Sequence, residues 1–331
     1  MRLAVKLFAA AALSLGVAAG AMAQAYPVRP VQLVVPFTAG GPTDTVGRSL
    51  AQAMSKNLGQ SIVIENVGGA GGTVGAARVR NAQPDGYTLL LHHIGMSTAP
   101  TLYRKLPFNP LTDFEPIGLI VDVPMTLVAR SDFPPTTFAE FLTYVRANKD
   151  KLNFANAGIG AASHLCGLLF MSAIDTAFTT VPFRGTADVM NALLAKQVDF
   201  TCDQTTNTTG QIQAHLADRT KGVKVYAVTS ARRVPTLPDV PTLQEGGLRG
   251  FEVGVWHGLY APKGTPKAVV DRLVAAMQAA ARDPEFVKRM ADLGATVYGP
   301  ERITPAAHAA HLKSEIDRWA PIIQKAGAFA D

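Results

Sequence analysis

One stretch decides the fold: Val31-Gln32-Leu33-Val34-Val35-Pro36-Phe37-Thr38-Ala39-Gly40-Gly41-Pro42-Thr43-Asp44. Its start is mostly apolar and β-branched, which is typical of a buried strand. A loop rich in glycine and proline follows, and Asp44 stands where the N-cap of a helix is expected. Apolar residues then recur at helical spacing from Val46 to Leu58. This order predicts a strand, a glycine loop and a helix, the βα unit of an α/β sheet.

The loop at residues 36–43 also has the features of an anion site. Glycines let backbone N–H groups approach a ligand, and a helix N-terminus offers unpaired donors and a partial positive charge. No Gly-Lys-Ser/Thr follows and the dinucleotide fingerprint is absent, so a nucleotide loop is excluded. An ordinary tight βα turn is the alternative.

A second loop repeats this design at residues 156–164, Asn-Ala-Gly-Ile-Gly-Ala-Ala-Ser-His. It lies between an expected strand and an expected helix, with Ser163 as the expected N-cap. Ligands of open α/β sheets lie beyond the carboxyl ends of the strands. Two such loops, one in each lobe, could therefore face each other across a cleft, which favours the anion site over two plain turns.

Strands and helices alternate along the whole chain, which predicts an α/β fold with largely parallel sheets. The expected strands are 31–35, 61–65, 88–91, 127–129, 152–155, 179–183, 198–200 and 223–228, and the expected helices are 44–58, 74–81, 137–147, 163–174 and 188–195, with three more that start near 265, 284 and 305. Extended segments near 121–128 and 254–260 predict two hinge crossings. We therefore expect a signal peptide at 1–23, the first part of lobe 1 at 24–125, lobe 2 at 126–253, and the hinge return with the rest of lobe 1 at 254–331.

The N-terminus has the order of a secretory signal peptide. Arg2 and Lys6 precede an apolar run at 7–17, and Ala21-Met22-Ala23 is a small-x-small cleavage site. A membrane anchor is the alternative, but it needs about 20 apolar residues, and this run breaks into glycine and alanine earlier. We therefore expect export to the periplasm.

Composition excludes several classes. The 331 residues are 48% hydrophobic and 17% charged, which is typical of a globular protein. Removing Arg2 and Lys6 from the 31 basic residues leaves 29 against 25 acidic ones, a net charge of +4. These charges are scattered, so the basic stripe of a nucleic-acid-binding protein is absent. Cys166 and Cys202 permit one bridge in an oxidising compartment, but two free thiols remain possible, and no zinc spacing accompanies them.

Single polar residues give weaker signals. His164 could be a general base, but no Gly-x-Ser-x-Gly nucleophile exists, so a helix cap or a ligand contact is favoured. His92 and His93 are adjacent in a strand and point to opposite faces, which argues against a shared metal. Asp203 ends a strand beside the polar run Gln204 to Thr209, as a cleft contact or as part of a solvated loop. No catalytic residue, metal ligand or cofactor is therefore expected.

Several segments together resemble the Bug family, the extracytoplasmic receptors of tripartite tricarboxylate transporters. They are Pro36 to Asp44, Gly158 to Leu165, Pro238 to Thr242, Trp256 to Leu259 and Ala261 to Pro266, in order over nearly the whole mature chain. The resemblance implies a two-lobed periplasmic binding protein of type II that binds a small organic carboxylate, docks to a membrane permease and is a monomer.

The resemblance also implies a ligand site. It places a carboxylate between the two loops, held largely by backbone groups, at Phe37, Thr38, Ala39, Gly41, Asp44, Ala157, Gly158 and Ser163. The positions that vary with the ligand would be Arg184, Gly185, Thr186 and Asp203, and His93 is added to the set. Many members have serine where this chain has Ala161, so that hydroxyl contact must be missing or supplied by Ser163.

The ligand and the role stay open at this point. The weakly charged surroundings of His92, His93 and Ile94 favour an aromatic or weakly polar monocarboxylate or dicarboxylate over citrate. A ligand-binding partner of a membrane sensor kinase is an alternative to the transport receptor. A secreted hydrolase is a third hypothesis, which would need the nucleophile and base that are missing.

Overall fold

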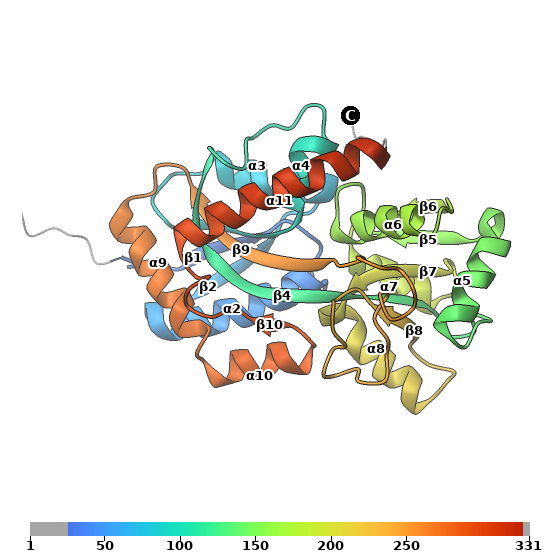
Figure 1. Cartoon of the computed structure of the whole chain (residues 1–331). Coiled ribbons are helices and arrows are strands. Elements are labelled where there is room, and N and C mark those ends of the chain that lie inside the picture. The colour runs from blue at the N-terminus through green and yellow to red at the C-terminus, as the bar shows by residue number, and fades with distance from the viewer. Residues whose placement is uncertain (1–25, 327–331) are drawn as a thin grey trace, which may run out of the picture.

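The computed structural model describes residues 26–326, so the predicted signal peptide lies outside the described residues. Two α/β lobes lie side by side and are joined by long strands (Figure 1). Between residues 26 and 326, no helix has the length and apolar character needed to span a membrane.

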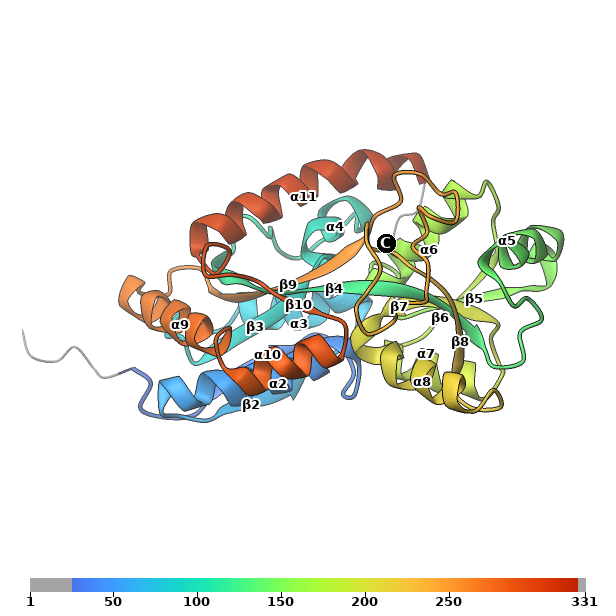
Figure 2. The same ribbon diagram turned by 60° about the horizontal axis from the view of Figure 1, so that its bottom comes forward.

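Lobe 1 is built on strands β1 (Val31–Val35), β2 (Ile62–Asn66), β3 (Thr88–His93) and β9 (Gly254–Pro262). β1 pairs in parallel with β2 and β3, while β9 runs antiparallel to β3. The helices of this lobe are α2 (Pro42–Leu58), α3 (Thr73–Arg80), α4 (Gly95–Leu102), α9 (Lys267–Ala280), α10 (Pro284–Asp292) and α11 (Pro305–Ala326), with the 3-10 turn η1 (Ala70–Gly72). In both ribbon views α11 and α2 lie on opposite sides of the sheet (Figure 2).

Lobe 2 contains β5 (Asn153–Asn156), β6 (Thr179–Pro182), β7 (Phe200–Gln204) and β8 (Val223–Val228). β5 pairs in parallel with β6 and β7, whereas β7 and β8 are antiparallel to β4. Its helices are α5 (Phe138–Ala147), α6 (Ala162–Ala173), α7 (Thr186–Leu194) and α8 (Thr205–Ala217), with the 3-10 turn η2 (Lys149–Lys151). The sheets are thus mixed, and the expectation of largely parallel sheets was wrong because the crossing strands return in the opposite direction.

The two expected crossings are strands that pair with each other, β4 and β9. β4 (Phe114–Arg130) pairs with β9 in lobe 1 and continues without a break into lobe 2, where it pairs with β7 and β8. A short strand, β10 (Thr296–Val297), also pairs with β4. This pair of strands carries the hinge, while the division of the chain at residues 126 and 254 stays a prediction.

Two expected helix caps were wrong. The N-cap of α2 is Gly41, so Asp44 lies within the first turn, and the N-cap of α6 is Ala161, so Ser163 also lies inside its helix. Both side chains instead accept hydrogen bonds from the preceding loop. The residues expected as a polar loop after Asp203 form the first turns of α8.

A disulfide joins Cys166 of α6 to Cys202 of β7, with the two Cα atoms 6.0 Å apart. Both residues are buried. Around them, the core of lobe 2 is aromatic, with Phe141 in ring contact with Phe170, Phe200 and Tyr226. The bridge therefore ties together the two elements whose ends reach the cleft.

Candidate binding site

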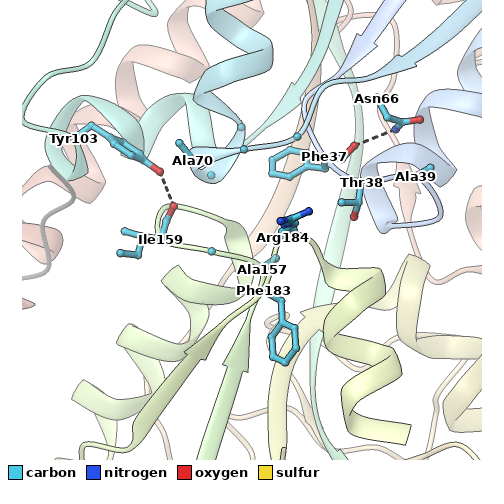
Figure 3. A pocket seen from close by; sticks show the side chains of 15 residues that line it. Phe37, Thr38, Ala39, Asn66, Ala70, Tyr103, Ala157, Ile159, Phe183 and Arg184 are labelled. Atoms are coloured by element: carbon cyan, nitrogen blue, oxygen red, sulfur yellow. Dashed lines mark hydrogen bonds between the residues drawn. The ribbon is translucent and has the colours of Figure 1, made fainter. Parts of the chain in front are cut away.

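A cavity of about 1030 Å³ opens between the lobes. Figure 3 shows its wall, with Arg184 between the loop of Phe37 and Thr38 and the loop of Ala157. The lining residues are Phe37, Thr38, Ala39, Asn66, Gly68, Gly69, Ala70, Gly71, Gly72, Tyr103, Ala157, Gly158, Ile159, Phe183 and Arg184. Both glycine loops therefore line one cavity.

A small inner pocket lies beside this cavity and shares Phe37 and Ala157 with it. It holds about 10 Å³, close to the space of one water molecule. The first residues of four helices line it: Pro42 and Thr43 of α2, Ala162 and Ser163 of α6, Thr186 of α7, and Gln204 before α8. Four helix N-termini thus converge on one point.

None of these four ends has a side-chain cap within the described part of the chain. By contrast, Thr137 caps α5 and Asp283 caps α10, both away from the cavity. Helix α9 is also uncapped, so the convergence rather than the open end distinguishes the four. Unpaired N–H groups and aligned dipoles at one point favour an anion there.

Asp44 shapes the first loop instead of capping the helix. Its carboxylate accepts hydrogen bonds from the Gly40 N–H at 2.9 Å, the Asn66 Nδ2 at 2.9 Å and the Arg48 Nε at 2.8 Å. Burial alone would raise the pKa of Asp44, but the bonds from Arg48, Gly40 and Asn66 bring that pKa below its usual value. The carboxylate therefore stays charged and fixes the loop.

Ser163 has the matching role in the second loop. Its Oγ accepts a hydrogen bond from the Ala157 N–H at 2.9 Å. Gly158 and Gly160 have φ values of 99° and 84°, which side chains rarely adopt, so the loop requires glycine at both positions. The His164 Nδ1 accepts a bond from the Gly160 N–H, and burial lowers the pKa of His164 to about 4. His164 thus supports the second loop rather than capping α6, so the expected cap was wrong, and contact of His164 with a ligand stays a prediction.

Three buried histidines cluster at the inner pocket, and His93 is part of its lining. The ring of His93 stacks on Phe37 with 4.5 Å between centroids, and His92 and His257 lie 5.0 and 5.7 Å from it. Burial lowers the pKa of His92 to about 3 and that of His257 to about 4. No three acidic, histidine or cysteine side chains in residues 26–326 are arranged to hold a metal.

Backbone contacts fix the tautomers of two neutral rings. The His93 Nδ1 accepts from the Gly95 N–H at 3.0 Å, so His93 carries its proton on Nε2. The His257 Nδ1 lies 3.0 Å from the Val255 carbonyl and must donate to it. Its Nε2 therefore accepts from the Thr43 hydroxyl at 3.3 Å. This contact joins the start of α2 to the crossing strand β9.

Lobe 2 contributes a cation, Arg184, and a buried acid, Asp203, near the cavity. Arg184 is exposed and forms no ion pair with any residue that the structure describes. Asp203 is buried and accepts hydrogen bonds from the Gln204 N–H and the Asn207 Nδ2, while burial raises the pKa of Asp203 to about 7. The Gln204 Oε1 is buried without a partner among the described residues.

The predicted site residues separate into two groups. The cavity or the inner pocket is lined by Phe37, Thr38, Ala39, His93, Ala157, Gly158, Ser163, Arg184 and Thr186. The other four, Gly41, Asp44, Gly185 and Asp203, lie behind the walls, where Gly41 and Gly185 are the N-caps of α2 and α7. Their contact with a ligand stays a prediction.

Several lining residues were not expected from the sequence. They are Asn66, the glycine turn Gly68 to Gly72, Tyr103, Ile159, Phe183 and Gln204. The glycine turn follows β2 as the other loops follow their strands, so the same signal was available there. Tyr103 directly follows α4, a helix that the sequence analysis did not expect.

A cavity between two α/β lobes joined by crossing strands defines a two-lobed solute-binding protein. The family model of the tripartite tricarboxylate transporter family receptor matches residues 46–328, and the chain belongs to this family. The resemblance to the Bug receptors is thereby confirmed.

Solved structures of similar proteins agree with this family assignment. The periplasmic binding protein BugD is 56% identical, with a TM-score of 0.89 over 92% of this chain and 100% of its own. MatC from Rhodopseudomonas palustris, solved with bound malate, is 44% identical, with a TM-score of 0.84 over 90% and 100%. An R. palustris protein solved with adipate is 32% identical, with a TM-score of 0.84 over 91% and 98%. The family and these neighbours are solute-binding receptors rather than enzymes.

Proposed function

We propose that this protein captures a small linear dicarboxylate in the periplasm for a tripartite tricarboxylate transporter. The observation that carries the proposal is the convergence of four uncapped helix N-termini on the inner pocket. One carboxylate would accept hydrogen bonds from these N–H groups, with the Ser163 hydroxyl beside it. Neutral histidines behind the pocket add no positive charge, so the helix ends supply the attraction.

Arg184 would hold the second carboxylate. It lines the larger cavity, and it forms no ion pair with an acid that the structure describes. A guanidinium with free donors suits a carboxylate. Neighbours solved with malate and adipate support the dicarboxylate among the ligand classes that the sequence left open.

Location and partners complete the proposal. The expected signal peptide would export the chain, and the mature protein would work as a monomer that closes its lobes at residues 126 and 254 and docks to a membrane permease. Cell fractionation and size-exclusion chromatography test location and oligomeric state. Uptake of the ligand by cells lacking the permease tests the partnership and separates transport from the sensor-kinase alternative.

The central experiment is calorimetric titration of the mature protein with malate, adipate, succinate, benzoate and citrate. We expect saturable binding of a dicarboxylate and a gain in unfolding free energy of about 2.7 kcal/mol at a hundredfold excess over Kd. Binding of benzoate alone would favour the aromatic alternative, and binding of no acid would reject the proposal.

Arg184→Gln tests the role of the second carboxylate. We expect a dicarboxylate to lose about 1.5 to 3 kcal/mol of binding free energy, the range for a hydrogen bond to a charged group, and its monocarboxylate analogue to lose little. Arg219→Gln is the matched control, because Arg219 is also exposed in lobe 2 but lines a different pocket. Equal losses for both ligand types would remove Arg184 from the site.

A further inference from the structure

The outer rim of the cavity contains a hydrogen bond between the lobes. The Tyr103 hydroxyl, just after α4 of lobe 1, donates to the Ile159 carbonyl in the second loop of lobe 2 at 2.6 Å. Figure 3 shows this bond on the opposite side of the cavity from Thr38 and Ala39. Because Tyr103 belongs to lobe 1 and Ile159 to lobe 2, the bond forms only when the lobes are close together.

Two glycines let the lobes come this close. A Cβ at Gly71 would collide with the Ile159 carbonyl oxygen and would lie 2.7 Å from the Tyr103 hydroxyl. A Cβ at Gly160 would lie 3.0 Å from the Tyr103 ring. Tyr103 therefore packs closely against one glycine of each lobe, Gly71 of lobe 1 and Gly160 of lobe 2.

The hydroxyl is a donor at every relevant pH. Burial raises the pKa of Tyr103 to about 12, so the group stays protonated. The Ile159 side chain is 42% exposed, and its backbone carbonyl makes the contact with Tyr103 (Figure 3). Because the Tyr103 hydroxyl donates its only proton to the Ile159 carbonyl, it holds the two lobes together and does not donate to a ligand.

We propose that the bond from Tyr103 to the Ile159 carbonyl is a latch between the lobes that slows the release of the ligand. The proposal rests on the proposed function, since release presumes a captured ligand. Opening must break the bond, whereas entry into the open form does not involve it. The latch therefore acts on the dissociation rate, and Tyr103 is a positioning residue.

Tyr103→Phe tests the latch, because phenylalanine keeps the ring against Gly160 and removes only the donor. With the dicarboxylate that binds best in the titration, stopped-flow kinetics should show release about three- to tenfold faster and association within about twofold of the wild type. Tyr144→Phe on α5 is the matched control, since its hydroxyl makes no hydrogen bond within residues 26–326, and it should leave both rates unchanged.

Gly71→Ala provides a second route to the same contact, because its methyl group would push the Ile159 oxygen away. It should also speed release, and combining it with Tyr103→Phe should add little, since both changes break one bond. An unchanged release rate in Tyr103→Phe would overturn the latch. Slower association with unchanged release would also overturn it and make Tyr103 a ligand contact.

An interlobe distance keeps the latch testable if the proposed function fails. Spin labels at positions 63 and 194, exposed residues of lobe 1 and lobe 2, report the separation without any ligand. We expect a larger share of long distances in Tyr103→Phe than in the wild type, and identical distributions would overturn the latch. Failure of the wild type to bind any acid would reject the proposed function separately.

Discussion

Phe37 and the three histidines behind it give the inner pocket shape rather than charge. Desolvation holds the pKa of His93 well below its usual value, with His92 and His257 adding mutual repulsion. A neutral ring whose tautomer is set by the backbone presents one fixed donor. At this scale the attraction for an anion comes from Arg184 and the helix ends, so the three histidines should add no pH dependence to the affinity between pH 8 and 5.

Gly41→Val is a test of the contact between the lobes at the start of α2. The backbone of Gly41 has φ −80°, which any residue adopts, so strain is not the reason for glycine. A Cβ there would lie 3.1 Å from the Thr186 Oγ1 of lobe 2 and 3.4 Å from the Thr38 carbonyl oxygen. We expect valine to hold the lobes apart and to weaken binding at least tenfold in calorimetric titration.

The control for Gly41→Val is Gly210→Ala in α8, where an added Cβ meets nothing within 4 Å. It should keep the wild-type affinity and raise stability by up to about 1 kcal/mol. Wild-type affinity in Gly41→Val would show that the first loop does not close against α7.

At the scale of elements, the sequence predicted the loops better than the helices between them. Glycines after a buried strand identified both loops, because the residue types and their order carry the signal. Helix α8 was missed because it begins Thr205-Thr206-Asn207-Thr208-Thr209, residues of low helix propensity that tertiary packing overrides. Helix α4 was missed because Pro100 lies inside it.

The convergence of helix ends could not be read from the chain. Each uncapped end resembles an ordinary turn by itself, and only the meeting of four of them distinguishes the site. The same holds for Tyr103 and Ile159, whose contact depends on the relative position of the lobes. Prolines at 116 and 124 likewise hid the continuity of β4, which pairing with β9 maintains.

The disulfide gives a prediction for α6 and β7. It closes a loop with a sequence separation of 36 residues, and such a bridge contributes roughly 3 to 4 kcal/mol through the unfolded state. Replacing Cys166 and Cys202 together by serine should lower the unfolding free energy by about that amount in urea titration. Because Ser163 and Gln204 lie near the ends of these elements, binding should also weaken. Unchanged stability would mean that the bridge does not form in solution.

At the scale of the whole molecule, the buried ionisable groups make stability depend on pH. Burial lowers the pKa of six histidines, His92, His93, His164, His257, His308 and His311, which favours their neutral forms in the fold. The unfolded chain protonates them near their ordinary pKa of about 6.5. Their contribution is complete above that pH and is lost progressively as the pH falls toward 4.

Two buried acids, Asp203 and Asp122, change stability with pH in the opposite sense to the histidines. Burial raises the pKa of Asp203 to about 7 and that of Asp122 to about 6. Each keeps a proton that the unfolded chain releases above about pH 4, so each stabilises the fold as the pH falls from 7 to 4. Because six histidines outnumber these two acids, the unfolded chain binds more protons than the folded protein at pH 5.

We therefore expect the unfolding free energy to be nearly level above about pH 7 and to fall steeply from about pH 6.5 toward pH 5. Urea titrations between pH 8 and 5 measure it, in protein freed of ligand. His308→Gln is the informative variant, because His308 on α11 packs against Tyr260 of β9, and both of its ring nitrogens are buried without a described partner. Removing the His308 imidazole should reduce the slope of unfolding free energy against pH, below pH 6, by the equivalent of about one bound proton. A stability that is flat or rises from pH 6.5 to 5 would mean that these histidines are protonated in the folded protein.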